Sequence, residues 1–374
     1  MFGLELRLFM LAKLIQGFFK HIDSFLISCL LFTLLVGLFV LYSASGQSFS
    51  RISSQLINIG VALTAMWLVA NIQPQLLERI AVPAYILGVF LLICVALFGD
   101  ISHGARRWLN LGFTKIQPSE VMRIAAPMML AWFFAKREAS PRIQDFMIAA
   151  VLLIVPVALI MKQPDLGTSL MITASGFYVL FLAGLSWKFL LGGAVSIGAM
   201  APIFWSMLHD YQRRRIEILI DPTQDPLGAG YHTIQATIAL GSGGVTGKGW
   251  LNGTQSQLDF LPERTTDFIF AVFGEEFGLI GNLLLLVLFS LIIARGLVIA
   301  GQAQTTFSRL LAGSITLTFF TYAFVNIGMV SGILPVVGVP LPLISYGGTS
   351  MVSLFVCFGI LMSIRTHKKL VASG

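Results

Sequence analysis

A carboxylate followed by apolar residues is the clearest candidate for catalysis in this sequence. Asp267 follows Thr266 and precedes the apolar run 268–270, which places it at the expected start of an apolar helix. Loss of hydration raises the pKa of such a carboxylate and makes it a better proton acceptor. Thr266 or Asp267 could equally cap the helix by accepting from its first N–H groups. The residues alone support catalysis and capping to the same degree.

Basic side chains recur at positions that would face one side of a membrane. Arg106 and Arg107 are adjacent, and Lys115 follows shortly after them. Glu120 and Arg123 are three residues apart, so they share one face of a helix and are able to pair. Any single pair of these residues could have a purely structural role. Basic groups repeated along one rim predict an anionic, lipid-linked ligand.

Glycines cluster between residues 241 and 249, with Lys248 among them. The spacing superficially resembles a phosphate-binding loop, but no Ser or Thr follows the lysine and no strand is expected before it. A second interpretation is a turn that approaches a large substrate closely, with its N–H groups and Lys248 facing a phosphate. A merely flexible loop explains the glycines equally well.

Membrane-spanning helices are the elements that must position these side chains. Of the 374 residues, 56% are hydrophobic and only 11% are charged, whereas soluble domains carry about 25% charged residues. This composition excludes a soluble globular enzyme, a disordered chain and a collagen-like protein. The net charge of +7 is typical of basic cytoplasmic loops and gives no reason to expect nucleic acid as a partner. Cys29, Cys94 and Cys357 lie in apolar runs and predict neither disulfides nor a metal site.

Charge-free runs predict ten transmembrane helices, because an ionisable group at the bilayer centre is unfavourable. The last uncharged stretch, 310–364, is long enough for two helices and is broken by three prolines and a glycine between 335 and 342. The predicted spans are 24–50, 52–77, 80–99, 118–135, 146–161, 166–187, 189–208, 277–294 extended back towards Phe268, and two helices within 310–364.

Charge placement predicts that both termini are cytoplasmic. In that orientation thirteen Lys and Arg residues lie in cytoplasmic segments and five in short outer segments, as the positive-inside rule requires. Residues 1–22 are expected to form an interfacial segment, and 209–266 one large extracytoplasmic loop between the seventh and eighth helices. The predicted fold is an all-α polytopic membrane protein with a single domain, 1–374.

Ordered motifs from about residue 40 to 367 resemble those of the SEDS family (shape, elongation, division and sporulation). The motifs are Ser43-Ala-Ser-Gly46, Arg107-Trp108, Gln117-Pro-Ser-Glu120, Gln163-Pro-Asp-Leu-Gly-Thr168, Asp221-Pro-Thr-Gln-Asp-Pro-Leu-Gly-Ala-Gly-Tyr231, the glycine cluster ending in Trp250, Leu261-Pro-Glu, Thr266-Asp-Phe-Ile-Phe270 and Pro340-Leu-Pro-Leu-Ile-Ser-Tyr-Gly-Gly348. Gly249-Trp250 and Gly253-Thr-Gln-Ser-Gln257 favour the elongation branch of the family over its division branch.

The resemblance implies a peptidoglycan glycosyltransferase of the bacterial cytoplasmic (inner) membrane. Such an enzyme polymerises lipid II into β-1,4 glycan strands for cell elongation and rod shape, and its active site lies on the extracytoplasmic face. The resemblance also implies that Asp267 is essential, and we expect it to act as general base on the acceptor hydroxyl in an inverting reaction. The implied partners are lipid II, the glycan linked to undecaprenyl pyrophosphate, and a class B penicillin-binding protein transpeptidase.

We expect a set of polar, basic and aromatic side chains to bind this substrate. They are Arg51, Arg106, Arg107, Trp108, Lys115, Gln117, Ser119, Glu120, Arg123, Asp165, Lys248, Glu263, Thr266 and Ser345. The sequence has no compact metal-ligand motif, so a divalent cation (Mg²⁺ or Mn²⁺) is expected from pyrophosphate chemistry only.

Two residues depart from the family's pattern. Thr265 stands where many members have histidine, so the expected chemistry does not require a histidine there. Arg123 stands where lysine is common, which keeps the charge but changes the hydrogen-bond geometry.

A lipid II flippase and a non-catalytic scaffold are the rival functions. Intramembrane Glu and Arg with helix-breaking prolines suit a transporter, but the polar residues gather on the outer side.

Overall fold

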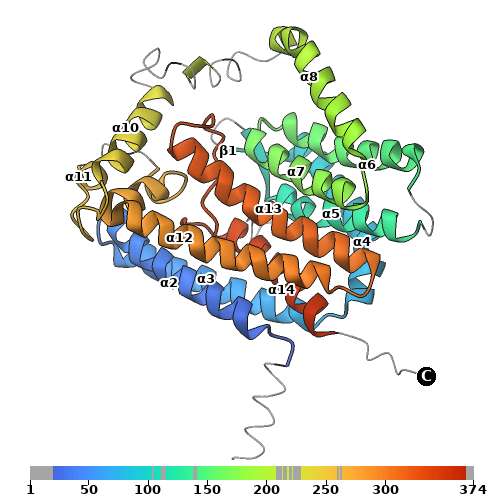
Figure 1. Ribbon diagram of the computed structural model, residues 1–374, viewed down its shortest axis with the longest axis horizontal. Helices are drawn as coiled ribbons and strands as arrows, with labels where there is room; N and C mark the ends of the chain where they lie inside the picture. The colour runs from blue at the N-terminus through green and yellow to red at the C-terminus, as the bar shows by residue number, and fades with distance from the viewer. Residues whose placement is uncertain are drawn as a thin grey trace, which may run out of the picture.

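The protein is described by a computed structural model that covers residues 20–102, 105–110, 115–137, 141–207, 213, 217–218, 221, 229–258, 261 and 263–367. Most of its helices pack side by side in one bundle (Figure 1). They are α2 (Ser24–Ala44), α3 (Phe49–Ala70), α4 (Pro74–Phe98), α5 (Pro118–Ala135), α6 (Ile143–Met161), α7 (Leu166–Leu182), α8 (Trp187–Met207), α10 (Ala229–Ser242), α11 (Thr254–Gln257), α12 (Ile269–Gly301), α13 (Thr306–Val330) and α14 (Thr349–Thr366).

Seven helices of the described chain are long and apolar enough to cross a membrane. They are α2, α3, α4, α6, α12, α13 and α14. Two shorter apolar helices are α7 and the 187–200 part of α8. Helical spans satisfy their backbone hydrogen bonds internally, which hydrocarbon surroundings demand. The predicted polytopic, mostly helical membrane protein is therefore confirmed at this level.

Several predicted span limits differ from the helices, because capping and backbone geometry decide where a helix begins and ends. The run 24–50 divides at a turn with positive φ at Gly46 and Gln47, after which Ser48 caps α3. The run 52–77 extends beyond the end of α3, because Pro74 already opens α4. The predicted end at 294 is too early, since α12 continues past Arg295.

A short antiparallel sheet, which the sequence did not predict, connects α4 to α5. Its strands are β1 (Asp100–Ser102), β2 (Ala105–Asn110) and β3 (Lys115–Ile116), in the order β1-β2-β3. Trp108 pairs with Asp100, and Leu109 pairs with Ile116. Arg107 and Trp108 therefore lie on an ordered strand instead of an irregular loop.

Helix α13 lies in the middle of the bundle, between α7 and α12 (Figure 1). Small residues let the neighbouring helices approach closely, as is common in membrane bundles. A Cβ added at Gly296 of α12 would lie 2.3 Å from Oγ1 of Thr316 in α13. A Cβ at Gly359 of α14 would lie 2.6 Å from the carbonyl oxygen of Met66 in α3.

The two ends of the described chain meet at one end of the bundle. Nδ1 of His21 lies 3.2 Å from Oγ1 of Thr366, and the rings of His21 and His367 stack at 4.1 Å. At the other end of α2, Ser43 donates a hydrogen bond to Glu276 in the first half of α12. Of the predicted interfacial segment 1–22, residues 1–19 lie outside the described part of the chain.

Candidate active site

Asp267 lies in the turn directly before α12, on a backbone fixed by neighbouring elements. Asn326 of α13 is fully buried and donates through Nδ2 to the carbonyl of Asp267 at 2.8 Å and to that of Val339 at 2.7 Å. Ser345 donates through Oγ to the carbonyl of Thr266 at 2.6 Å. Because α13 and the segment that carries Ser345 both hold this turn, the backbone at Asp267 has little positional freedom.

Neither Thr266 nor Asp267 serves as the cap of α12. The N-cap residue is Phe268, and no side chain makes a cap hydrogen bond. Thr266 instead donates through Oγ1 to Oε2 of Glu263 at 2.8 Å. The capping alternative for Asp267 therefore has no support in the geometry.

The surroundings of Asp267 favour the protonated carboxyl. The side chain is half-buried, and a Cβ added at Gly338, where φ is +73°, would lie 3.5 Å from its Oδ2. Burial, and secondarily the negative charge of Glu263, raises the pKa of Asp267 to about 6. A carboxylate with such a pKa is mostly ionised at pH 7 and is a stronger base than an exposed aspartate.

A cationic side chain approaches the same turn from α3. Arg51 donates through Nη1 to Oγ1 of Thr265 at 2.9 Å, and its side chain is exposed. Glu263 is also exposed and has a positive φ of 51°. Of the residues expected to bind substrate, Arg51, Glu263, Thr266 and Ser345 are thus the ones gathered at the Asp267 turn.

Arg107 and Asp165 form a second group beside this turn. Arg107 donates through Nη2 to the carbonyl of Pro164 at 2.7 Å, and its Nε lies 3.9 Å from Oδ2 of Asp165. Asp165 also accepts from the N–H of Thr168 and so caps α7. A Cβ added at Gly167 would lie 2.7 Å from the carbonyl oxygen of Val337, so the start of α7 packs against the segment that faces Asp267.

Glu120 and Arg123 form a largely buried ion pair near the start of α5. Their atoms Oε2 and Nη1 are 2.8 Å apart, and the guanidinium also lies 4.9 Å from the centre of the Tyr322 ring. Ser353 of α14 donates to the same carboxylate. Arg123 and Ser345 line one cavity of about 60 Å³, which connects this pair to the Asp267 turn.

A separate, larger groove of about 650 Å³ is lined by Glu120 of this ion pair. Gln117, Glu120 and Ser353 form its polar end, and apolar side chains of α3, α4, α5 and α14 line the rest. Ser119 is buried in the first turn of α5. Trp108 is half-buried on β2. Arg106 and Lys115 lie on β2 and β3, but their side chains are outside the described part of the structure.

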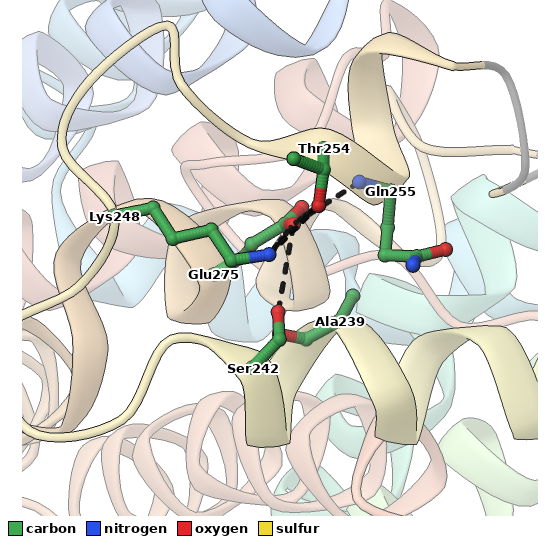
Figure 2. Close-up of polar contacts among 6 residues, drawn as sticks. All are labelled: Ala239, Ser242, Lys248, Thr254, Gln255 and Glu275. Carbon is green, nitrogen blue, oxygen red and sulfur yellow. Dashed lines mark hydrogen bonds and ion pairs between the residues drawn. The ribbon is translucent and has the colours of Figure 1, made fainter.

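Lys248 does not join the other candidates at the Asp267 turn. Its Nζ lies 2.8 Å from Oε1 of Glu275, a carboxylate inside α12 (Figure 2). Sequence reasoning did not assign roles to Asn326 or Gly338. A buried asparagine in an otherwise apolar span was an available signal, because polar groups in membrane helices need partners.

Comparison with known proteins identifies relatives over nearly the whole chain. The FTSW_RODA_SPOVE family, described as cell cycle protein, matches residues 23–370. The peptidoglycan glycosyltransferase MrdB of Escherichia coli strain K12 is 52% identical over 355 residues, which cover 95% of this chain and 96% of that protein. The MrdB of Helicobacter pylori strain J99 is 36% identical over 341 residues, with 90% and 88% coverage.

Solved structures share the fold. A chain of a peptidoglycan synthase complex, reported for its structural coordination of polymerization and crosslinking, has a TM-score of 0.81, 29% identity, and coverage of 93% of this chain and 99% of that chain. The rod shape determining protein RodA of Thermus thermophilus has a TM-score of 0.70, 26% identity, and coverage of 92% and 96%. The resemblance of the motifs is thereby confirmed. The chain belongs to the FTSW_RODA_SPOVE family of cell cycle proteins.

Proposed function

We propose that this protein is a peptidoglycan glycosyltransferase of the bacterial cytoplasmic membrane, which polymerises lipid II into β-1,4 glycan strands for elongation and rod shape. Its relatives from E. coli and H. pylori bear that enzyme name. The observation that carries the proposal is the half-buried carboxylate of Asp267, with a pKa of about 6, on a turn that Asn326 and Ser345 hold in place.

Asp267 acts as the general base. It takes the proton from the 4-hydroxyl of the acceptor GlcNAc while that oxygen attacks C1 of the donor MurNAc. The bond from C1 to the pyrophosphate oxygen breaks, undecaprenyl pyrophosphate leaves with the electron pair, and the configuration inverts from α to β. A positioned base contributes about 10²–10⁴-fold to the rate.

Basic side chains near Asp267 neutralise the departing pyrophosphate. Arg51 and Arg107 are the described candidates, because both guanidinium groups lie next to segments that contact Asp267 or its neighbours. Preorganised cationic donors stabilise developing charge without reorganising in the transition state. Arg106 and Lys115, which lie on β2 and β3 of the same sheet, are expected to extend this set.

The groove of about 650 Å³ holds an undecaprenyl chain. Its lining is apolar along α3, α4, α5 and α14, and Gln117, Glu120 and Ser353 provide a polar end for the head group. An apolar groove with polar groups at one end matches a lipid whose charged pyrophosphate lies at the membrane surface.

The proposed topology has ten spans, which adds α5, α7 and α8 to the seven long apolar helices, within one membrane domain. The pairing of Glu120 with Arg123 supports α5 as a span, because neither charge is left unpaired. Both termini are placed in the cytoplasm. Asp267 and the large loop 209–266 are placed on the extracytoplasmic face, and the contact between His21 and Thr366 supports termini on a common side.

A class B penicillin-binding protein transpeptidase is the proposed partner. Support comes from the structural neighbour, whose description joins polymerization to crosslinking in one synthase complex. For a metal ion, the described residues contain no group of three or more His, Cys, Asp or Glu side chains that could hold one. Mg²⁺ often binds through one or two carboxylates and substrate phosphates, so an expected Mg²⁺ or Mn²⁺ would arrive with the pyrophosphate.

The test is polymerisation of labelled lipid II by the purified protein with its transpeptidase partner and a divalent cation. We expect a ladder of glycan strands from the unaltered protein and none from Asp267→Asn, although this variant should fold and bind lipid II. A ladder of normal yield from Asp267→Asn would contradict the role of Asp267. Absence of any ladder from the unaltered protein, together with lipid II translocation in vesicles, would favour the flippase.

A further inference from the structure

The backbone of α12 is interrupted at Gly278, and the glycine-rich segment 243–249 occupies the interruption. Gly278 has φ 64° and ψ −162°, which lie outside the helical region. The break deprives the carbonyls of Glu275 and Glu276 of the N–H groups four residues ahead. The N–H groups of Lys248 and Gly249 donate to these two carbonyls instead, at 3.0 Å each.

The glycine-rich segment also accepts hydrogen bonds from the residues of α12 that follow Gly278. The N–H groups of Leu279 and Ile280 donate to the carbonyls of Gly244 and Val245 at 2.9 and 3.1 Å. A Cβ at Gly247 would lie 2.1 Å from the carbonyl oxygen of Glu276, so the close approach requires glycine. The segment thus replaces the helical hydrogen bonds lost at the break, and it is neither a flexible loop nor a phosphate-binding loop.

One buried carboxylate fixes this segment in place. Glu275 is 0% exposed, and its Oε1 accepts from Nζ of Lys248 at 2.8 Å, Oγ1 of Thr254 at 3.0 Å and the N–H of Gln255 at 3.0 Å (Figure 2). Oγ of Ser242, at the end of α10, lies 3.5 Å away. A buried carboxylate without a cation is strongly destabilising, so Lys248 supplies the charge that this position requires.

Helix α10 connects this cluster to the Asp267 turn. Its end contributes Ser242 to Glu275, and near its start the ring of His232 stacks on Phe268 at 5.9 Å. A Cβ at Gly274 would lie 2.2 Å from Cδ1 of Leu240, which shows how closely α10 and α12 pack. The first two turns of α12 are therefore held at both ends by α10.

We infer that Lys248 and Glu275 are positioning residues for catalysis. Their ion pair locks the glycine-rich segment into the break of α12 and thereby fixes the start of the helix that follows Asp267. Lys248 then does not hold the substrate pyrophosphate, which is the role expected from its sequence position. This inference rests on the proposed polymerase function, because the predicted effect is a loss of turnover.

A double-mutant cycle separates the two roles of Lys248. Lys248→Met leaves the Glu275 carboxylate buried without a cation, and we expect kcat for lipid II polymerisation to fall about tenfold with an unchanged KM. Glu275→Gln keeps an acceptor oxygen for Thr254 and Gln255, so it should recover most of kcat when combined with Lys248→Met. The thermal midpoint in detergent should fall in Lys248→Met and recover in the double variant.

Different outcomes would overturn the inference. If Lys248 holds pyrophosphate, Lys248→Met will raise KM, and adding Glu275→Gln will bring no recovery. Additive effects of the two substitutions on both kcat and thermal midpoint would likewise show that Lys248 and Glu275 are not coupled. Lys188→Met, at an exposed lysine in the first turn of α8, is the matched control and should change neither quantity. Failure of the proposed function itself is distinguishable, because the unaltered protein would then form no strands.

Discussion

At the scale of single residues, two opposing requirements act on Asp267. The carboxylate has to be ionised to accept a proton, yet it has to be basic enough to hold one. Burial supplies the basicity, and Glu263 adds a smaller contribution in the same direction. Gly338 lies beside Oδ2 of Asp267 and has a positive φ, a backbone conformation that favours glycine at this position.

The pH dependence of polymerisation should report the ionisation of Asp267. Because only the carboxylate accepts a proton, the rate should fall as pH decreases through about 6, the pKa of this group. Glu263→Gln removes a negative neighbour, which lowers the pKa of Asp267 and should move this acidic limb to lower pH. The measurement is kcat/KM for lipid II between pH 5 and 8 for both proteins. An acidic limb at the same pH in Glu263→Gln would contradict the electrostatic coupling.

At the scale of elements, the site depends on contacts between helices that are distant in sequence. Asn326 of α13 binds two carbonyls, one before α12 and one in the segment that leads to α14. Ser345 makes the corresponding contact from that segment to Thr266. The catalytic turn is therefore a product of helix packing, and its own sequence is insufficient to fix it.

Replacing Asn326 should impair both stability and turnover. Asn326→Leu leaves the carbonyls of Asp267 and Val339 without their donor, and an unsatisfied buried polar group costs about 1–3 kcal/mol. We expect a lower thermal midpoint and a lower kcat with a nearly unchanged KM. Thr318→Val is the matched control on the same helix, because the hydroxyl of Thr318 has no hydrogen-bond partner among the described residues. Equal effects of the two substitutions would argue against a specific role for Asn326.

At the scale of the whole molecule, an ion pair joins the first and the later helices at the end of the bundle far from Asp267. Asp23 caps α2 and is contacted by Arg295 of α12 and Arg365 of α14. Burial opposes ionisation of Asp23, but hydrogen bonds from Arg295 and the N–H of Leu26, with the charges of Arg295 and Arg365, outweigh it and lower the pKa of the carboxyl. The carboxylate therefore stabilises the fold above the ordinary pKa of aspartate, and this contribution is lost as the pH falls through the lowered value.

Asp23→Asn should lower the stability of the bundle without acting on the reaction directly. Hydrogen bonds to charged groups contribute about 1.5–3 kcal/mol, so a reduced thermal midpoint in detergent at neutral pH is expected. Glu78→Gln is the control, since Glu78 pairs with the largely exposed Lys136, and exposed pairs contribute about 0–1 kcal/mol. Equal thermal midpoints for the two variants would contradict the expected contribution of the Asp23 contacts to stability.

The sequence was sufficient for properties that depend on local composition. Apolar runs without charge indicate membrane helices wherever they occur, and the ordered motifs identified the family. Asp267 could be singled out because a carboxylate beside an apolar helix start is chemically unusual. Exact helix ends were less predictable, because Ser48 and Pro74 set them through capping and backbone geometry.

Only the tertiary structure decided how these residues are held and which of them act together. Asn326 lies 59 positions from Asp267, and Lys248 lies 27 positions from Glu275, so no local pattern reveals either contact. The glycine-rich segment illustrates the difference. Its composition was consistent with flexibility or phosphate binding, whereas its role depends on the break at Gly278 that it fills. Hydropathy depends on residues that are neighbours in the sequence, whereas hydrogen-bond partners and the pairing of buried charges depend on how distant segments pack.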